Sequence, residues 1–576
     1  MRLLALGLVL AATAGPLSTP LGPILALPEE APAPLPLPPP DALEAAPDGG
    51  AESVPPAPDD PLEFLYAHRI NFASEGAPLV TVRLMEGQDE IDLSGETQLR
   101  VQLRGAGQKE VGVPAGVSVR FRLSAATPAK LADYAQVADV AFRDRAGLAK
   151  ARALWEGRGL PVTVRTIGTV YGIAGRVLDN RRELVLVGEA GDRAAAEAEI
   201  ALLRRRYDAV ATLHEELLDR PHGVVEIADG AGGVAIAASQ DVAIVEALEV
   251  GSIEVKRVEY GVGYAFHGFA DRRYRGRLYA VVGEDGKLAL VEALPLEELL
   301  RGLVPSEIYA SSPPAALEAQ AVTARGEVLA KIGARHLTDP YLLCAEQHCQ
   351  VYAGLGGERP STDAAVRATR GEALFSKDGL VDSVYSAICG GHTENNEVVW
   401  GGPPDPSLRG VSDLLEGDAD PGPGSTEASL RRWLSADPPA YCHLPGQAGS
   451  PKYRWSRRFE SAEIDALAAP LGVGRVRRLV PLDRGVSGRA AALRVEGERG
   501  VAEVRGELVI RKLFRNLPSS AFVVDPEPAG FVFRGAGWGH GVGMCQTGAI
   551  GRALRGESYR DILRHYFNGA DPSKIY

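Results

Sequence analysis

The segment GWGHGVGMCQTGA, residues 537–549, places five glycines around a histidine, a cysteine and a glutamine. Glycine serves where φ is positive or where another group must approach the backbone closely. The segment is therefore either a loop that faces a substrate or a tight turn that contains His540. A neighbouring histidine alone does not establish a cysteine nucleophile, so Cys545 does not predict one.

A carboxylate and a cation fall close together in VPSEIYASSPPAALEAQAVTAR, residues 304–325. Glu307 follows a proline in the predicted loop before a helix, and Arg325 lies within that helix. A carboxylate on a loop that a rigid helix supports, with a cation nearby, fits acid–base chemistry. The alternatives are an acid that interacts with the helix dipole and a solvated arginine. Spacing alone favours these alternatives.

The helix that supports this pair is predicted over residues 311–333. Ser312 can cap its start, Pro313 suits its first turn and Gly333 can end it. Four apolar residues recur at spacings of four, three and four, as on one buried face of a helix, namely Leu317, Ala321, Ala324 and Val328.

The elements around that helix are mainly short strands. Alternating apolar residues predict strands within residues 78–87, 91–103 and 117–123. Residues 275–294 predict a hairpin that turns at Asp285 and Gly286. A short helix is predicted over 294–303, ending before Pro305, a strand over 379–387, and one final helix after residue 544.

Residues 131–207 form a separate pattern of strand, helix, strand, strand and helix. Asp192 is a candidate N-cap of the second helix. This order predicts a small sandwich with helices on one sheet. Together with the strands on either side, it gives an α+β fold for the chain.

The N-terminus and composition limit the class of protein. Residues 1–26 have an arginine, a short apolar run and the sequence Ala12-Thr13-Ala14, the plan of a cleaved signal peptide and its flank. The Pro-rich residues 27–62 predict an extended tether. The net charge of −13 argues against a nucleic-acid partner. We expect an exported protein of the periplasm or cell envelope, without a membrane span after signal cleavage.

Five cysteines lie in the C-terminal half of the chain, at positions 344, 349, 389, 442 and 545. An odd number in an exported protein leaves at least one thiol free, bound to metal or paired between chains. Disulfides Cys344–Cys349 and Cys389–Cys442 are both reasonable in an oxidising compartment.

Residues 131–207 resemble the SPOR domain, a peptidoglycan-binding module. The resemblance rests on YAQVADVAFRDRAGLAKARALWEGRGLPV and LVLVGEAGDRAAAEAEIALLRRR. The alternative is a generic ferredoxin-like module, because small α+β units recur in many proteins.

Four motifs between residues 304 and 549 together resemble the SpoIID/LytB family. In chain order they are VPSEIYASSPPAALEAQAVTARGEVL, CQVYAG, YSAICGGHTENNEVVWGG and GWGHGVGMCQTGA. The resemblance implies a mixed, β-rich catalytic domain over 225–576 with a long active-site helix. Residues 65–128 look like the family's N-terminal strand region, so the βαββα SPOR-like domain would be an insertion.

The resemblance implies a lytic transglycosylase that cuts glycan strands stripped of stem peptides, between MurNAc and GlcNAc, and leaves 1,6-anhydroMurNAc ends. The family's glutamate in P-S-E falls on Glu307, and its helix arginine falls on Arg325. The glycan strand is the expected partner, as it is for SPOR domains. The alternative is a non-catalytic binder that enhances a cell-wall amidase. A cysteine- or zinc-dependent wall hydrolase lacks a supporting motif.

The other family motifs supply candidate substrate contacts and a candidate metal site. His540 and Gln546 can hydrogen-bond sugar hydroxyl or acetamido groups. The motif YSAICGGHTENN adds four further candidates, Tyr385, Cys389, His392 and Thr393. Some relatives bind zinc just before Q-V-Y, which corresponds to His336, Cys344 and Cys349, with His348 nearby. A structural zinc and a disulfide remain alternatives, and no cofactor is expected to be required for catalysis.

Overall fold

The computed structural model describes residues 60–576 except 74–75, 106–108, 174–175, 208, 231–232, 263–266, 347, 416–421 and 444–449. The predicted signal peptide and nearly all of the predicted tether lie outside the described residues, as does part of the loop after Leu415. Within the described part of the chain, no helix combines the length and apolarity that a membrane crossing requires.

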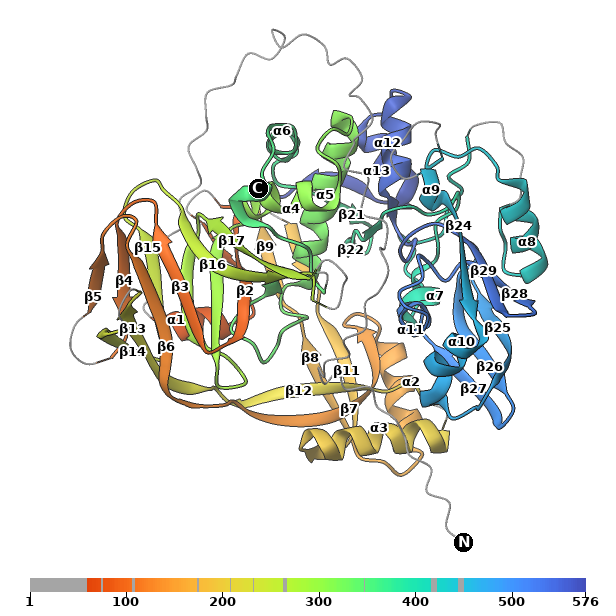
Figure 1. Cartoon of the computed structure of the whole chain (residues 1–576), viewed down its shortest axis with the longest axis horizontal. Helices are drawn as coiled ribbons and strands as arrows, with labels where there is room; N and C mark the ends of the chain where they lie inside the picture. Colours follow the sequence, from red (N-terminus) through yellow and green to blue (C-terminus); the bar gives the residue numbers. More distant parts are fainter. Residues whose placement is uncertain are drawn as a thin grey trace.

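Two antiparallel sheets share one apolar core and form a sandwich (Figure 1). In one, the strand order is β1 (Asn71–Phe72), β2 (Pro78–Gln88), β19 (Leu288–Pro295), β18 (Arg277–Val282), β15 (Val242–Ala247), β4 (Leu99–Leu103) and β5 (Glu110–Val113), and β20 (Leu343–Cys344) adds parallel to β2. In the other, the order is β14 (Ala235–Gln240), β13 (His222–Asp229), β6 (Ser118–Thr127), β3 (Glu90–Gly95), β16 (Ile253–Tyr260) and β17 (Gly268–Tyr274).

The strand order of the sandwich places an insertion between β6 and β13. β2 pairs with β19, β4 with β15, and β6 with β13. Strands from before residue 128 therefore lie beside strands from after residue 221 in both sheets. Alternating buried residues set the register; in β4 these are Leu99, Val101 and Leu103. The hairpin β18–β19 forms as predicted, with Gly286 at φ 77° in its turn.

The inserted unit is a four-stranded antiparallel sheet with two helices on one face, drawn below the sandwich in Figure 1. Its elements are β7 (Lys130–Ala141), α2 (Arg145–Glu156), β8 (Val162–Ile167), β11 (Arg182–Gly191), α3 (Arg193–Tyr207) and β12 (Thr212–Asp219). Asp192 caps α3 as predicted, because its Oδ1 accepts from the Ala195 amide at 2.9 Å. The predicted order lacked β12 and a separate hairpin, β9 (Val170–Ile173) with β10 (Arg176–Asp179). The likeness to a SPOR domain stays a prediction.

The inserted unit caps the end of the central helix α5 (Pro314–Lys331). The Asn180 side-chain amide donates to the carbonyls of Ile332 at 2.7 Å and Ala330 at 3.1 Å, and the Gly168 amide donates to the Gly333 carbonyl at 2.7 Å. The last carbonyls of a helix have no partner within it. The loops around β9 and β10 therefore supply the donors that α5 lacks.

The helix before α5 is longer than predicted. α4 spans Leu296–Glu307 and contains Pro305. A proline removes only its own N–H, and in the last turn this costs a single helical hydrogen bond. Glu307 is therefore the last helical residue of α4 and not part of a loop that enters α5. The predicted cap of α5 was also wrong, because the N-cap is Pro313 and Ser312 makes no capping hydrogen bond.

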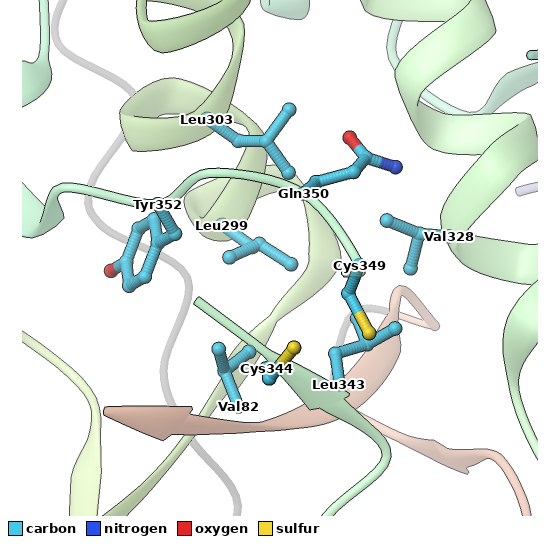
Figure 2. A pocket seen from close by; sticks show the side chains of 9 residues that line it. All are labelled: Val82, Leu299, Leu303, Val328, Leu343, Cys344, Cys349, Gln350 and Tyr352. Atoms are coloured by element: carbon cyan, nitrogen blue, oxygen red, sulfur yellow. The ribbon is translucent and has the colours of Figure 1, made fainter. Parts of the chain in front are cut away.

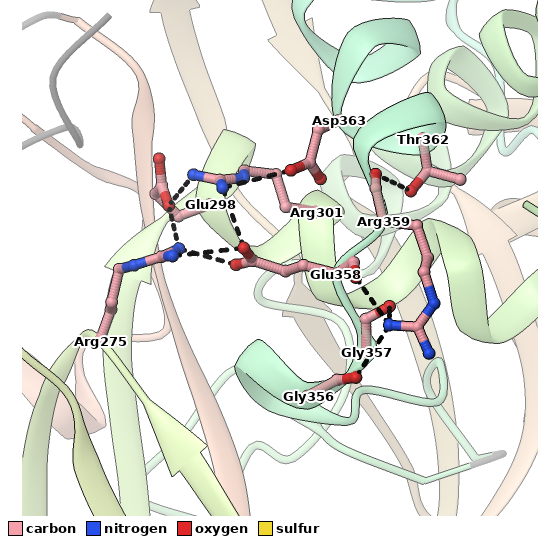
Figure 3. A network of polar contacts seen from close by, with 9 residues as sticks. All are labelled: Arg275, Glu298, Arg301, Gly356, Gly357, Glu358, Arg359, Thr362 and Asp363. Atoms are coloured by element: carbon pink, nitrogen blue, oxygen red, sulfur yellow. Dashed lines mark hydrogen bonds and ion pairs between the residues drawn. The ribbon is translucent and has the colours of Figure 1, made fainter. Parts of the chain in front are cut away.

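A network of ion pairs holds the start of α4 against the β17–β18 turn and α6 (Pro360–Ala368), as Figure 3 shows. Arg301 pairs with Glu298 at 3.1 Å, Glu358 at 2.9 Å and Asp363 at 3.2 Å. Arg275, from the turn, also contacts Glu358, at 2.7 Å. Arg275 and Arg301 both pair with Glu298 and with Glu358. The network therefore links α4, the β17–β18 turn and the segment that leads into α6.

The C-terminal part contains a second lobe, drawn in blue on the right of Figure 1. It includes two three-stranded sheets, β24 (Arg454–Glu460)–β29 (Gly530–Ala536)–β28 (Phe522–Glu527) and β25 (Val476–Arg484)–β26 (Ala490–Gly497)–β27 (Gly500–Arg505), with α8 (Glu427–Ala436), α10 (Ser461–Ala468) and α11 (Glu507–Leu513). Phenylalanines fill its core, among them Phe514, Phe522 and Phe533.

After this lobe the chain returns to the central helices. β30 (Met544–Cys545) pairs in parallel with β23 (Tyr385–Ser386), and α12 (Gln546–Leu554) and α13 (Tyr559–Tyr566) pack near α5. β31 (Asp571–Lys574) then joins β21 (Glu372–Ser376). The single predicted final helix is thus two helices and a strand. The predicted strand over 379–387 is reduced to β22 (Gly379–Leu380) and β23.

We predict that Asn180→Ala lowers the free energy of unfolding by about 1–3 kcal/mol, because carbonyls at the end of α5 lose their donor. Chemical denaturation measures the change. The control is Asn568→Ala, because Asn568 is exposed and makes one long hydrogen bond, 3.4 Å to the Pro406 carbonyl. Equal losses in both variants would contradict the capping role.

Candidate functional site

Glu307 lies at the meeting point of α4, α5, the loop after β20 and α12. Its Oε1 accepts from the Val351 amide at 3.3 Å. Its backbone carbonyl accepts from the Gln546 side-chain amide at 2.8 Å, and the same amide donates to Gln320 Oε1 at 3.1 Å. The buried Gln546 therefore holds the end of α4 against α5, and Glu307 as a whole residue is half-buried.

The surroundings of Glu307 favour its neutral form. Burial is the main cause that raises its pKa, to about 7, and the nearby Glu327 carboxylate adds to the effect. The Val351 amide and Lys331 lower the pKa, but by less. A carboxyl group with a pKa near neutrality can both donate and accept a proton at physiological pH.

Sequence reasoning named Tyr385 and Gln546 near this carboxyl group but missed the polar residues Gln320, Glu327, Lys331 and Gln350. Glu327 pairs with Lys331 one turn further along α5. The Tyr385 hydroxyl donates to Gln350 Oε1 at 3.1 Å, and burial, followed by the charges of Glu307 and Glu327, raises the pKa of Tyr385. Gln320, Glu327 and Lys331 recur at spacings of seven and four on α5. That polar stripe was the available signal.

Arg325 does not contact Glu307. The guanidinium, which is 0% exposed, makes two 2.8 Å hydrogen bonds to the carboxylate of Glu297 in the first turn of α4. It also donates to the Glu372 carbonyl at 2.9 Å. Among the described residues, Glu307 is not one of the hydrogen-bonding or ion-pair partners of Arg325. A glycan cannot reach a guanidinium that is fully enclosed by protein.

The glycines of residues 537–549 make room for the chain itself. Gly537, Gly541 and Gly543 have φ between 69° and 78°, where side chains are strained. A Cβ on Gly543 would lie 2.1 Å from the Val384 carbonyl oxygen, and one on Gly541 would lie 2.3 Å from the Arg489 guanidinium. The close approach inferred from the sequence is therefore made by protein groups.

His540 is neutral and has both ring nitrogens engaged. Burial lowers its pKa to about 3. Its Nε2–H donates to the Tyr385 carbonyl at 2.9 Å, and its Nδ1 accepts from the Val542 amide at 3.1 Å. The ring lies 5.0 Å from that of Trp400, which is 54% exposed. His540 thus packs beneath an exposed aromatic surface. Trp538, which is 37% exposed, lies two residues before His540 in the chain.

The turn after β23 does not present its polar residues to solvent as predicted. Cys389 and Thr393 are buried, and the Thr393 hydroxyl accepts from the Val411 amide at 2.7 Å. His392 donates from Nδ1 to the Thr393 carbonyl at 2.7 Å. Cys389 and Thr393 therefore stabilise the fold at this position. Of the four candidates in this motif, Tyr385 is the one that lies beside Glu307.

The predicted metal ligands come together with a fourth residue. One ligand atom from each of His336, Cys344, His348 and Cys349 lies within 4.8 Å of the others. His336 Nε2 is 3.3 Å from the Cys349 sulfur, and His348 Nδ1 is 3.7 Å from both sulfurs. All five cysteines of the chain are free thiols, so neither predicted disulfide is present. Two imidazoles and two thiols form a set that zinc prefers.

A small cavity lies beside these cysteines, between α4, α5 and β2 (Figure 2). Its volume is about 10 Å³ and its lining is mainly apolar, including Leu299, Leu303 and Val328. A space of about 10–15 Å³ is the minimum for one water molecule. The cavity is therefore too small to admit a sugar.

We predict that Arg325→Met lowers the free energy of unfolding by about 3–5 kcal/mol, because the buried Glu297 carboxylate loses its partner.

Glu307→Gln should leave the free energy of unfolding unchanged or raise it near pH 8. The folded state raises the pKa of Glu307, so above pH 7 folding carries the cost of a charge that glutamine lacks. Thermal and chemical denaturation compare the two variants. Similar small effects in both would contradict the structural role of Arg325.

Comparisons with known proteins match two segments of this chain. The family model described as Stage II sporulation protein matches residues 284–375, which contain α4, α5 and Glu307. A domain of unknown function, DUF8618, matches residues 394–543, which contain the C-terminal lobe.

Similar proteins include members with names related to sporulation and to amidases. An uncharacterised protein of Brachyspira hyodysenteriae is 28% identical, over 54% of this chain and 74% of its own length. Stage II sporulation protein D of Bacillus amyloliquefaciens is 28% identical, over 49% and 76%. The amidase enhancer of Bacillus subtilis is 26% identical, over 47% of this chain but only 39% of its own length. The chain is therefore similar to proteins of the SpoIID/LytB family, above all in the segment that contains α4 and α5.

Proposed function

We propose that this protein is a lytic transglycosylase that cleaves denuded peptidoglycan strands between MurNAc and GlcNAc. The observation that carries the proposal is the Glu307 carboxyl group, held at the end of a rigid helix with its pKa raised to about 7. The names of the sporulation and amidase-enhancer relatives support a role in remodelling the cell wall.

In the proposed reaction one carboxyl group acts twice. Protonated Glu307 donates its proton to the glycosidic oxygen, the bond from C1 of MurNAc to that oxygen breaks, and GlcNAc leaves with a hydroxyl group. The Glu307 carboxylate then removes the proton from the C6 hydroxyl of MurNAc, whose oxygen bonds to C1. This closes the 1,6-anhydro ring, restores protonated Glu307 and consumes no water.

The groups around Glu307 suit this double role. Glycosidases that use water usually employ two carboxylic groups, one of which positions the water or attacks the sugar. Glu327 is a second carboxylate near Glu307, but it is enclosed and paired with Lys331. We propose that Glu327 keeps Glu307 protonated and does not activate water. Gln546, Val351 and Arg325 would act as positioning residues for α4.

Exposed aromatic rings provide candidate sugar-binding surfaces near the loop of His540. Trp400 packs against His540 and exposes its ring. Aromatic faces suit sugars because they are apolar and rigid. We propose that Trp400 and Trp538 bind the glycan strand and that the inserted SPOR-like unit holds the same strand. The proposed location of the protein is the periplasm or cell envelope, where that substrate occurs.

We propose that His336, Cys344, His348 and Cys349 hold a structural zinc ion. The donor set fits, and His336 has φ 55°, a strained value that marks a constrained position in a non-glycine residue. Asp339 contacts the other His336 nitrogen at 3.0 Å, as expected for an outer partner of a ligand. The ion would fix the loop that delivers Val351 and Gln350 to the site, and catalysis would not require it directly.

A second candidate function is non-catalytic enhancement of a cell-wall amidase. The similarity to the amidase enhancer of Bacillus subtilis favours it. A binder does not need a carboxyl group with a raised pKa, so the presence of Glu307 in this state favours the enzyme.

We predict that the purified protein converts amidase-treated glycan strands to 1,6-anhydroMurNAc products, which mass spectrometry identifies as one water lighter than hydrolysis products. Glu307→Gln keeps the shape but removes the acid and the base, so the rate should fall by about 10²–10⁴-fold or more. Binding of the strands without cleavage by the unaltered protein would contradict the enzyme and favour the amidase enhancer. Products with reducing ends would contradict the transglycosylase.

We predict that kcat/KM falls above pH 7, by about tenfold per pH unit, because the acid must be protonated before reaction. Glu327→Gln removes a nearby negative charge, so it should lower the pKa of Glu307 and shift this alkaline decline to lower pH. The control is Glu318→Gln on the same helix, whose carboxylate is not among the groups that affect the Glu307 pKa. The same shift in both variants would contradict the role of Glu327.

A further inference from the structure

We propose that Cys389, Asp413, Cys442 and Cys545 form a second metal site, which binds zinc and joins the C-terminal lobe to the central helices. All four residues are buried, and one ligand atom from each lies within 4.8 Å of the others. They come from four separate segments. Cys389 lies in the turn after β23, Asp413 in the loop before α8, Cys442 in the loop after α8 and Cys545 at the start of α12. This cluster shares no residue with the group around His336.

The measured spacings match the edges of a zinc tetrahedron. With Zn–S bonds of about 2.3 Å and a Zn–O bond of about 2.0–2.2 Å, tetrahedral geometry gives ligand separations of roughly 3.5–3.8 Å. The Cys389 sulfur is 3.5 Å from the Cys442 sulfur and 3.5 Å from Asp413 Oδ2. These two separations lie at the short end of that range, and the four ligand atoms all lie within 4.8 Å of one another.

The contacts outside the cluster orient two of the ligands toward its centre. The other oxygen of Asp413, Oδ1, accepts from the Tyr566 hydroxyl at 2.8 Å and from Arg552 at 3.4 Å, which leaves Oδ2 for the cluster. The Cys545 sulfur accepts from the backbone amides of Cys389 at 3.1 Å and Gly548 at 3.3 Å. Metal ligands in proteins are commonly fixed by outer hydrogen bonds of this kind.

Charge and ligand type favour zinc. Three thiolates and one carboxylate carry the same charge as four thiolates, a common structural set for this ion. Arg552 lies against Asp413 and reduces the remaining negative charge. Soft thiolate ligands exclude magnesium and calcium, which prefer oxygen.

A disulfide between Cys389 and Cys442 explains less of the geometry. It would use two of the four converging groups and leave the Cys545 sulfur and the Asp413 carboxylate enclosed beside it. A metal uses all four. Asp413 and Cys442 lie inside the region matched by the domain of unknown function, and Cys389 and Cys545 lie outside it. The ion would therefore fasten that region to the rest of the chain.

The test uses the full chain, purified with a thiol reductant and reconstituted with zinc alone. Elemental analysis after desalting counts the bound metal. In the Cys344→Ser/Cys349→Ser variant, which disrupts the other cluster, we expect one zinc per chain. Addition of Cys442→Ser should remove that zinc. Failure of the first variant to retain any zinc would overturn the proposal.

Cobalt(II) provides a second measurement that does not depend on the fold of the Cys442 variant. In the Cys344→Ser/Cys349→Ser protein, Co²⁺ should give a thiolate-to-metal absorption band and the visible bands of a tetrahedral site. Asp413→Asn, which keeps the three thiols, should shift the visible bands. Absence of the thiolate band, or a Cys389–Cys442 disulfide in peptides from protein purified without reductant and with zinc present, would overturn the proposal. Neither measurement depends on glycan cleavage.

Discussion

The buried ion pair between Arg325 and Glu297 holds α4 against α5, and the position of Glu307 depends on it. Glu297 also accepts from the Tyr576 hydroxyl at 2.5 Å and from the Gly371 amide at 3.3 Å, so the pair joins the two helices to the C-terminus and to the segment before β21. Because a helix is rigid, fixing the first turn of α4 fixes the direction of its last turn. Gln546 then fastens that last turn to α5 and α12.

This arrangement places a carboxyl group where burial and charge both favour its neutral form. The same helix that supplies Arg325 for the fold supplies Glu327 and Lys331 for the site, on a different face. The surrounding loops complete the environment: one contributes the Val351 amide, and another contributes Tyr385, whose carbonyl accepts from His540. Burial and the neighbouring charges thus favour the protonated form of the residue proposed to act on the substrate.

Local sequence patterns predicted the helices, strands and caps of this structure better than they predicted the contacts between them. The buried stripe of α5, the β18–β19 hairpin and the Asp192 cap are all encoded within a few residues, so they could be predicted from spacing. The extension of α4 past Pro305 was missed because a proline usually ends a helix, although in the last turn it removes only one hydrogen bond. Family motifs pointed to Glu307, and its catalytic role stays a prediction.

Long-range contacts could not be predicted in this way. An arginine within a helix is usually solvated, and its partner Glu297 is 28 residues away, so the sequence contains no local sign of the pair. The glycines of 537–549 were associated with a substrate, but the groups that approach them are protein groups, from residues 384–389, Asp413, Arg489, Tyr566 and Phe567. The four residues of the second cysteine cluster are likewise brought together only by the fold.

The protonation state of Glu307 tests the account most directly. Carbon-13 NMR of protein labelled at the glutamate side-chain carboxyl carbon would follow each carboxyl group with pH, and the signal missing from Glu307→Gln would identify the residue. The account predicts a midpoint near pH 7 for that signal in the free protein. A midpoint near the ordinary glutamate value, about 4.3, would contradict it, because Glu307 would then be ionised at neutral pH and unable to act as the acid.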